Sequence, residues 1–183
     1  EATDRLCRLF VKRFSPSREL MEAAVADGYK RLLAPSIENE TRGNAKQRAD
    51  DEAIAVFRSR YTTIGKFENF PYPGIEDLLK KLKSEGHRLY VATSKPEQMS
   101  MDILNKFELT PYFDLLAGAT LDGSRDTKAD VIAYLLSQTG DLDEIIMVGD
   151  TAFDVIGAKA HGIPTIGVSW GYGEVSDMID AGA

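Results

Sequence analysis

The chain has 183 residues, 43% hydrophobic and 28% charged, with a formal net charge of -7 and a pI near 4.9. This length allows one sizeable core plus a small accessory unit, and the excess of acids without a basic stripe argues against a nucleic-acid partner. Cys7 is the single cysteine, so we expect no intramolecular disulfide and a cytoplasmic location, and no signal peptide or long apolar run indicates a membrane partner.

The first 65 residues or so are predicted to be helical throughout. A stripe with the spacing i, i+3, i+4, i+8 indicates a first helix and consists of Leu6, Leu9, Phe10 and Phe14. Two further amphipathic segments, around residues 21–32 and 53–61, follow a Ser-Pro-Ser break and a polar span. Three such helices without a strand predict a small all-helical domain over residues 1–67.

From residue 68 onward, short apolar strands are expected to alternate with helices. The predicted strands are 88–93, 115–117, 145–149 and 164–168, and the predicted helices are 75–85, 96–107, 128–137 and 152–161. Alternation of this kind is typical of a parallel sheet with helical crossovers. We therefore predict an α/β fold with a Rossmann-like parallel sheet in a core domain of residues 68–183.

Two carboxylates follow the apolar strand 145–149. Asp150 stands at its carboxyl end after Gly149, and Asp154 follows in the first turn of the next helix. In open α/β sheets this edge is where ligands bind, and two converging carboxylates suit a hard cation such as Mg²⁺. The alternative is a strand end followed by an ordinary helix-capping Asp.

Two other segments carry groups suited to phosphate. Thr93 and Ser94 follow a strand and precede a helix, so a hydroxyl and backbone N–H groups are available there. Further along, Arg125 and Lys128 lie in and just after a polar loop before another helix, where they would hold an oxyanion. Simple helix capping by Thr93 and Ser94, and an ordinary solvated loop around Arg125, remain the alternatives.

The order of these elements resembles the haloacid dehalogenase superfamily of hydrolases. Thr93 after a strand, Lys128 opening a helix and the Gly149-Asp150-x-x-x-Asp154 element match its second, third and fourth motifs. The chain is most similar to the phosphoglycolate phosphatase-like branch, in which a helical cap is inserted after the first core strand. The segments that carry this similarity are 72–74, 92–96, 121–125, 154–159 and 171–173.

The resemblance implies a Mg²⁺-dependent phosphatase that acts on a small phosphorylated metabolite through an aspartyl-phosphate. It implies metal binding by Asp150 and Asp154, catalytic roles for these two acids together with Thr93 and Lys128, and substrate binding by Thr93, Ser94, Arg125 and Lys128. The family further implies a monomer or a homodimer.

The family's first motif, a strand that ends in Asp-x-Asp-Gly-Thr, is not found in this sequence. The Asp-x-Asp at residues 141–143 precedes the strand that leads to Asp150, so it lies at the wrong end of the sheet. We therefore expect the first core strand and its nucleophilic Asp to lie upstream of Glu1, and a last strand and helix to follow Ala183. Without that strand, the sheet would be open between the strands that end at Thr93 and Asp150.

Other functions fit parts of the same pattern. A sugar phosphomutase uses nearly the same core, whereas dehalogenase chemistry needs no metal and does not account for the pair of acids. A catalytically silent protein that keeps only the phosphate and metal pockets fits the missing motif, and an upstream Asp-x-Asp-Gly-Thr would distinguish the enzyme from this binder. A receiver-like domain also places acids at strand ends, but the helical N-terminal third argues against it.

Overall fold

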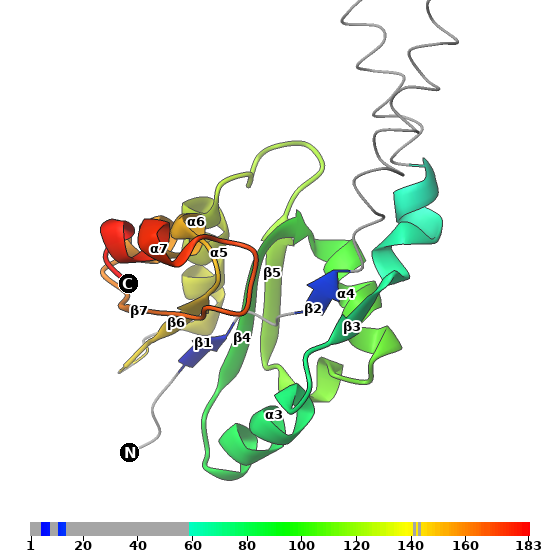
Figure 1. Cartoon of the computed structure of the whole chain (residues 1–183), viewed down its shortest axis with the longest axis horizontal. Coiled ribbons are helices and arrows are strands. Elements are labelled where there is room, and N and C mark those ends of the chain that lie inside the picture. The colour runs from blue at the N-terminus through cyan, green and yellow to red at the C-terminus, as the bar shows by residue number, and fades with distance from the viewer. Residues whose placement is uncertain (1–4, 8–10, 14–58, 141, 143) are drawn as a thin grey trace, which may run out of the picture. The chain divides into compact units, whose positions relative to one another are not determined.

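The computed structural model describes residues 5–7, 11–13, 59–140, 142 and 144–183 (Figure 1). By their internal contacts the residues form two compact units, one of Glu1–Lys12 with Pro71–Ala183 and one of Arg13–Phe70. The first unit contains the large sheet. The second includes a helical segment at residues 59–63, the short 3-10 helix η1 (Gly65–Phe67) and an exposed ion pair between Arg60 and Glu68.

The sheet of the first unit has five strands in the order β5-β4-β1-β6-β7, and every neighbouring pair is parallel. The strands are β1 (Arg5–Cys7), β4 (Leu89–Pro96), β5 (Leu115–Ala119), β6 (Met147–Gly149) and β7 (Thr165–Gly167). Helices connect β4 to β5, β5 to β6, and β6 to β7 along the chain. The predicted α/β fold with a parallel sheet is confirmed.

The first strand corrects two expectations. Residues 5–7 and 11–13 are strands, so the helix predicted from the Leu6 stripe is wrong there. The central position of the sheet is also filled, because Leu6 pairs with Tyr90 of β4 on one side and with Met147 of β6 on the other. Pairing on both edges satisfies the backbone groups of a short apolar segment, and this long-range gain outweighs the local helical pattern.

The remaining elements follow the predicted alternation with small shifts of their ends. The helices of the first unit are α3 (Ile75–Ser84), α4 (Glu97–Lys106), α5 (Lys128–Thr139), α6 (Ala152–Lys159) and α7 (Val175–Ala181), with the 3-10 helix η2 at Thr110–Tyr112. Strand β6 begins two residues later than predicted, and α7 was not predicted at all. The predicted helix over residues 21–32 lies outside the described residues, as does most of the one over 53–61. Separately, β2 (Val11–Arg13) and β3 (Asn69–Pro71) form a two-stranded sheet.

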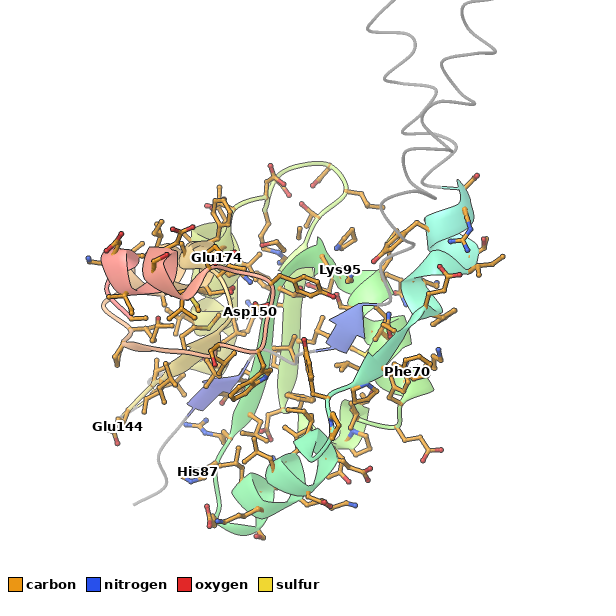
Figure 2. The ribbon with its side chains drawn as sticks, in the orientation of Figure 1. Phe70, His87, Lys95, Glu144, Asp150 and Glu174 are labelled. Carbon is orange, nitrogen blue, oxygen red and sulfur yellow. The ribbon has the colours of Figure 1, made fainter. Side chains whose placement is uncertain are left out.

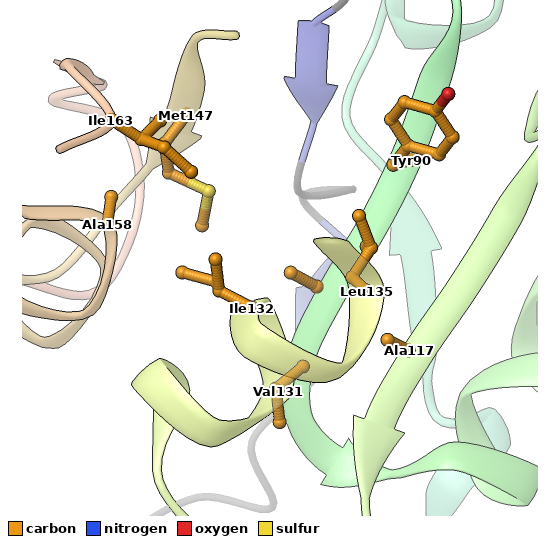
Figure 3. Packing of buried hydrophobic residues seen from close by; sticks show 9 residues of the cluster. Tyr90, Ala117, Val131, Ile132, Leu135, Met147, Ala158 and Ile163 are labelled. Carbon is orange, nitrogen blue, oxygen red and sulfur yellow. The ribbon is translucent and has the colours of Figure 1, made fainter. Parts of the chain in front are cut away.

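Helices cover both faces of the large sheet, and β4 shows why. Tyr90 and Ala92 point into a cluster with α5 and α6, drawn in Figure 3, whereas Leu89 and Val91 point into a second cluster with α3 and α4. Successive side chains of a strand alternate between faces, so the four successive apolar residues 89–92 of β4 need a cover on each side. The ends of the strands, rather than their faces, are therefore left for a ligand.

Within the described part of the chain, no helix is long and apolar enough to cross a membrane.

Candidate active site

Polar side chains gather at one end of the sheet. Strands β4 and β6 run parallel, so Thr93, in the carboxyl-terminal half of β4, and Asp150, directly after β6, lie toward the same end of the sheet. Figure 2 shows Lys95 and Asp150 at this end and His87 and Glu144 at the opposite end. Thr93 and Asp150 are buried, with exposed fractions of 9% and 4%. Each of these two strands therefore brings one buried polar side chain to this end of the sheet.

Lys128 joins this edge from a third element. It is the first residue of α5, and the helix begins there because Thr127 caps it through reciprocal hydrogen bonds with Asp130. The Lys128 ammonium donates to the carbonyl oxygen of Ala92, 3.0 Å away, and forms an ion pair with Asp154 Oδ1 at 3.0 Å. A buried ammonium therefore ties the middle of β4 to the start of α6.

Asp154 is fully buried and holds the turn that presents Asp150. Its Oδ2 accepts hydrogen bonds from the backbone N–H of Asp150 (3.2 Å), the backbone N–H of Thr151 (3.1 Å) and the Thr151 hydroxyl (2.9 Å). Its Oδ1 faces Lys128. Since both carboxylate oxygens contact protein groups, Asp154 is well placed to fix Asp150 and the ammonium relative to each other.

Asp150 is held from its other side by the loop between β7 and α7. Its Oδ2 accepts a hydrogen bond from the Tyr172 backbone N–H at 3.1 Å, and its carbonyl oxygen accepts one from the Gly173 N–H at 2.9 Å. At Gly171 a Cβ atom would lie 2.1 Å from the Cβ of Asp150, so only glycine permits this approach. The carboxylate has a fixed direction before any ligand arrives.

The described carboxylates of this site supply only part of the coordination shell that a Mg²⁺ ion needs. Within the described residues, no group of three or more His, Cys, Asp or Glu side chains is placed to hold a metal ion. Mg²⁺ nevertheless binds proteins through one or two carboxylates and completes its shell with water and substrate phosphate. The fixed carboxylate of Asp150 meets that requirement, and the contacts of Asp154 suit an indirect role.

Thr93 and Ser94 do not cap the helix that follows them, and phosphate binding by these two residues stays a prediction. The Thr93 hydroxyl accepts a hydrogen bond from the Lys95 N–H at 3.1 Å, and its own hydrogen can still be donated. Helix α4 begins at Glu97, with Pro96 as its N-cap and no capping side chain. Ser94 is exposed at this edge. The capping alternative therefore does not describe this segment.

Arg125 makes its contacts within the protein. Its Nε donates to the carbonyl oxygen of Gly118 (2.6 Å) and its terminal nitrogen to Glu97 Oε2 (2.5 Å), while the guanidinium carbon lies 3.8 Å from the centre of the Tyr134 ring. The Glu97 carboxylate also accepts from the Gly118 N–H. These hydrogen bonds among Arg125, Glu97 and Gly118, which we call the Arg125 brace, tie the end of β5 to the start of α4. Substrate binding by Arg125 stays a prediction.

A family model described as haloacid dehalogenase-like hydrolase matches residues 17–168. The chain belongs to this family. Among curated relatives, it is 42% identical to the tyrosine-protein kinase PtkA of Mycobacterium tuberculosis over 150 residues, which are 81% of this chain and 51% of PtkA. A 5'-nucleotidase of Pseudomonas aeruginosa is 37% identical over 128 residues, 69% of this chain and 58% of that protein. The chain thus spans about half the length of the curated relatives it matches.

Two further comparisons place the chain within the haloacid dehalogenase-like hydrolases. The phosphoglycolate phosphatase of Aquifex aeolicus is 33% identical over 135 residues, 73% of this chain and 63% of that enzyme. The crystal structure of a predicted phosphatase from Clostridium acetobutylicum superposes with a TM-score of 0.76 at 33% identity, over 100% of this chain and 92% of that one. The resemblance to the phosphoglycolate phosphatase-like branch is confirmed.

Several groups of this haloacid dehalogenase-like site were not singled out from the sequence. They are the Ala92 carbonyl, the Glu97 carboxylate, the Tyr172 N–H and the side chain of Tyr72. Two of them are backbone groups, which carry no residue-specific signal. The Gly171-Tyr172-Gly173 segment was singled out only for its similarity to the family. Its closely spaced glycines after a predicted strand could also have indicated a near approach of backbone to a side chain.

Proposed function

We propose that the chain is the phosphate- and metal-binding part of a Mg²⁺-dependent phosphatase that acts on a small phosphorylated metabolite. The observation that carries this proposal is the buried Lys128 ammonium, which contacts the Ala92 carbonyl of β4 and the carboxylate of Asp154, a residue that also accepts a hydrogen bond from the Asp150 backbone N–H. Phosphoryl transfer uses a positive charge that binds the phosphoryl oxygens and a carboxylate that binds a metal ion, and Lys128 and Asp150 offer these two groups at one end of the sheet. Relatives with the names 5'-nucleotidase and phosphoglycolate phosphatase add support.

In this proposal each residue has one task. The Thr93 hydroxyl and the Ser94 N–H donate hydrogen bonds to phosphoryl oxygens, and Lys128 contributes a positive charge to the same group. Asp150 would hold Mg²⁺, which when bound polarises the phosphoryl oxygens as a Lewis acid. Asp154 does not contact the substrate and keeps Asp150 and Lys128 in place through its hydrogen bonds and ion pair.

Hydrolysis by this family's chemistry also needs an attacking carboxylate. A carboxylate oxygen forms a bond to phosphorus as the P–O bond to the leaving group breaks, and water then cleaves the aspartyl-phosphate to release phosphate. Strand β1 lies between β4 and β6, where such a group would be delivered, but residues 5–13 contain no Asp or Glu. We therefore assign the attack to an Asp outside residues 5–13.

A second candidate function follows from that same strand. If β1 (residues 5–7) is the strand that borders the site in the functional protein, the site has no nucleophilic carboxylate there. It would then bind phosphate and a metal ion without hydrolysing a phosphomonoester. The presence of Arg5, Leu6 and Cys7 at the central position favours this candidate.

The test is phosphate release by the purified protein from p-nitrophenyl phosphate, phosphoglycolate and nucleoside monophosphates, with Mg²⁺ and with EDTA. The phosphatase predicts Mg²⁺-dependent release that falls by orders of magnitude in Asp150→Asn and not in Asp126→Asn, an exposed acid outside the site. Release that survives EDTA or Asp150→Asn would refute the proposal. A Tm raised by phosphate plus Mg²⁺, without any release, would instead support the binder.

A further inference from the structure

The loop between β7 and α7 is held at two points by polar contacts. On one side, the Tyr72 hydroxyl donates a hydrogen bond to the carbonyl oxygen of Trp170 at 2.8 Å. On the other side, the N–H groups of Tyr172 and Gly173 donate to Asp150. Tyr72 is thus linked to the Asp150 carboxylate through two consecutive peptide units, which join residues 170–171 and 171–172.

The two aromatic side chains of this loop are largely exposed. Trp170 and Tyr172 are 55% and 58% exposed, so neither is buried in the core. The ends of the loop are anchored by Val168 and Met178, which are 5% and 2% exposed. Between these anchors, hydrogen bonds to Tyr72 and Asp150 hold the backbone of the loop.

The loop and Asp150 are also in steric contact. The glycine backbone at 171 approaches the Asp150 side chain so closely that a Cβ atom would overlap it. A shift of the loop toward β6 would therefore push the carboxylate, and a shift away would remove the Tyr172 hydrogen bond. The position of the loop sets the direction of the carboxylate.

Tyr72 is suited to a constant role as hydrogen-bond donor. Its pKa is raised above the ordinary value by burial first, and then by the nearby Tyr172 and Asp150. The phenol keeps its proton throughout the neutral range, so this contact does not switch with pH. The direction of the shift also agrees with a phenol that lies near the carboxylate.

We propose that Tyr72 is a positioning residue for the metal site. Its hydroxyl holds the segment Trp170–Gly173 against Asp150 and so orients the carboxylate that would bind Mg²⁺. The metal part of this inference rests on the proposed function, whereas the positioning part rests on the contacts of Tyr72, Trp170 and Asp150.

The test compares Tyr72→Phe with Tyr112→Phe. The control removes a hydroxyl of the same kind, because the Tyr112 hydroxyl lies 3.4 Å from Glu76 Oε1. Tyr112 belongs to η2 and lies outside the site. Hydrogen exchange of the Tyr172 and Gly173 amides is measured by NMR without metal. Tyr72→Phe should accelerate both by about three- to tenfold, as expected for one lost hydrogen bond, and the control should not.

Mg²⁺ affinity is measured on the same samples. Trp170 is the single tryptophan of the chain, so its fluorescence during a MgCl₂ titration reports directly on this loop. Tyr72→Phe should weaken the apparent Mg²⁺ affinity by about three- to tenfold. Wild-type exchange rates in Tyr72→Phe, or faster exchange with unchanged Mg²⁺ affinity, would overturn the inference.

The two proposals fail differently. If the wild-type protein itself binds no Mg²⁺ with phosphate present, the proposed function is refuted, and with it the metal role of Tyr72. If the wild type binds Mg²⁺ and Tyr72→Phe binds it equally well, the proposed function stands and the inference on Tyr72 is wrong.

Discussion

Replacing Lys128 by Met tests whether the ion pair with Asp154 supports the fold as well as the site. Met keeps the length of the side chain but leaves a fully buried carboxylate without its cation, 3.0 Å from where the ammonium was. Loss of one partner of a buried pair costs about 3–5 kcal/mol. For a chain of this size, 1 kcal/mol shifts Tm by about 2–4 °C, so we expect Tm to fall by about 6–20 °C.

The assay is thermal and urea unfolding of Lys128→Met, Asp154→Asn and the double variant. In the double variant no unpaired charge remains, so its destabilisation should be smaller than the sum of the single ones. The control is Lys80→Met, because Lys80 forms an exposed pair with Glu76 at 2.8 Å and its loss should leave Tm nearly unchanged. Additive single effects, or a Lys128→Met protein as stable as the control, would refute the account of the buried pair.

Three further predictions concern other parts of the unit. Gly157→Ala would place a Cβ 2.4 Å from Lys128 Cγ, and urea unfolding should show a net loss because overpacking, about 1–3 kcal/mol, exceeds the helix-propensity gain of up to about 1 kcal/mol. Arg125→Lys cannot keep both forked hydrogen bonds and should lower stability by about 1–2 kcal/mol, whereas an unchanged Tm would contradict the brace. The pKa of Asp122 is lowered from 3.8 to about 2, first by a hydrogen bond from Thr120. The ionised Asp122 carboxylate therefore stabilises the fold above pH 3.8, and this stabilisation is lost as pH falls through about 2. A carbon-13 NMR titration of the Asp122 carboxyl with its midpoint near pH 4 would argue against these hydrogen bonds.

The core of the first unit could be predicted because its signals are local. The four strands of the large sheet after residue 88 each contain a short apolar or small-residue run, and helices separate them along the chain. Because parallel strands place their carboxyl ends at one edge of the sheet, this alternation alone brings Thr93 and Asp150 toward the same end. Lys128 was found for the same reason, since it opens a helix that follows a strand.

The central strand could not be predicted, because its stability comes from residues far away in the sequence. The stripe from Leu6 to Phe14 fits a helix locally, and only the edges of β4 and β6 make residues 5–7 a strand. The brace of Arg125 was missed in the same way, since its partner Glu97 lies 28 residues earlier. In both cases the contacts that determine the structure join residues far apart in the sequence, and neither composition nor residue spacing predicts them.

The close approaches at Gly157 and Gly171 bear on how a mutational scan of this protein would be interpreted. Neither residue has a functional group, yet each occupies space next to a site side chain, Lys128 in one case and Asp150 in the other. Every substitution adds a Cβ, so both positions should tolerate replacement as poorly as the charged residues beside them. A scan scored for function would therefore outline the shape of the space around the site as well as its chemistry. Comparing it with a scan scored for stability would separate the two.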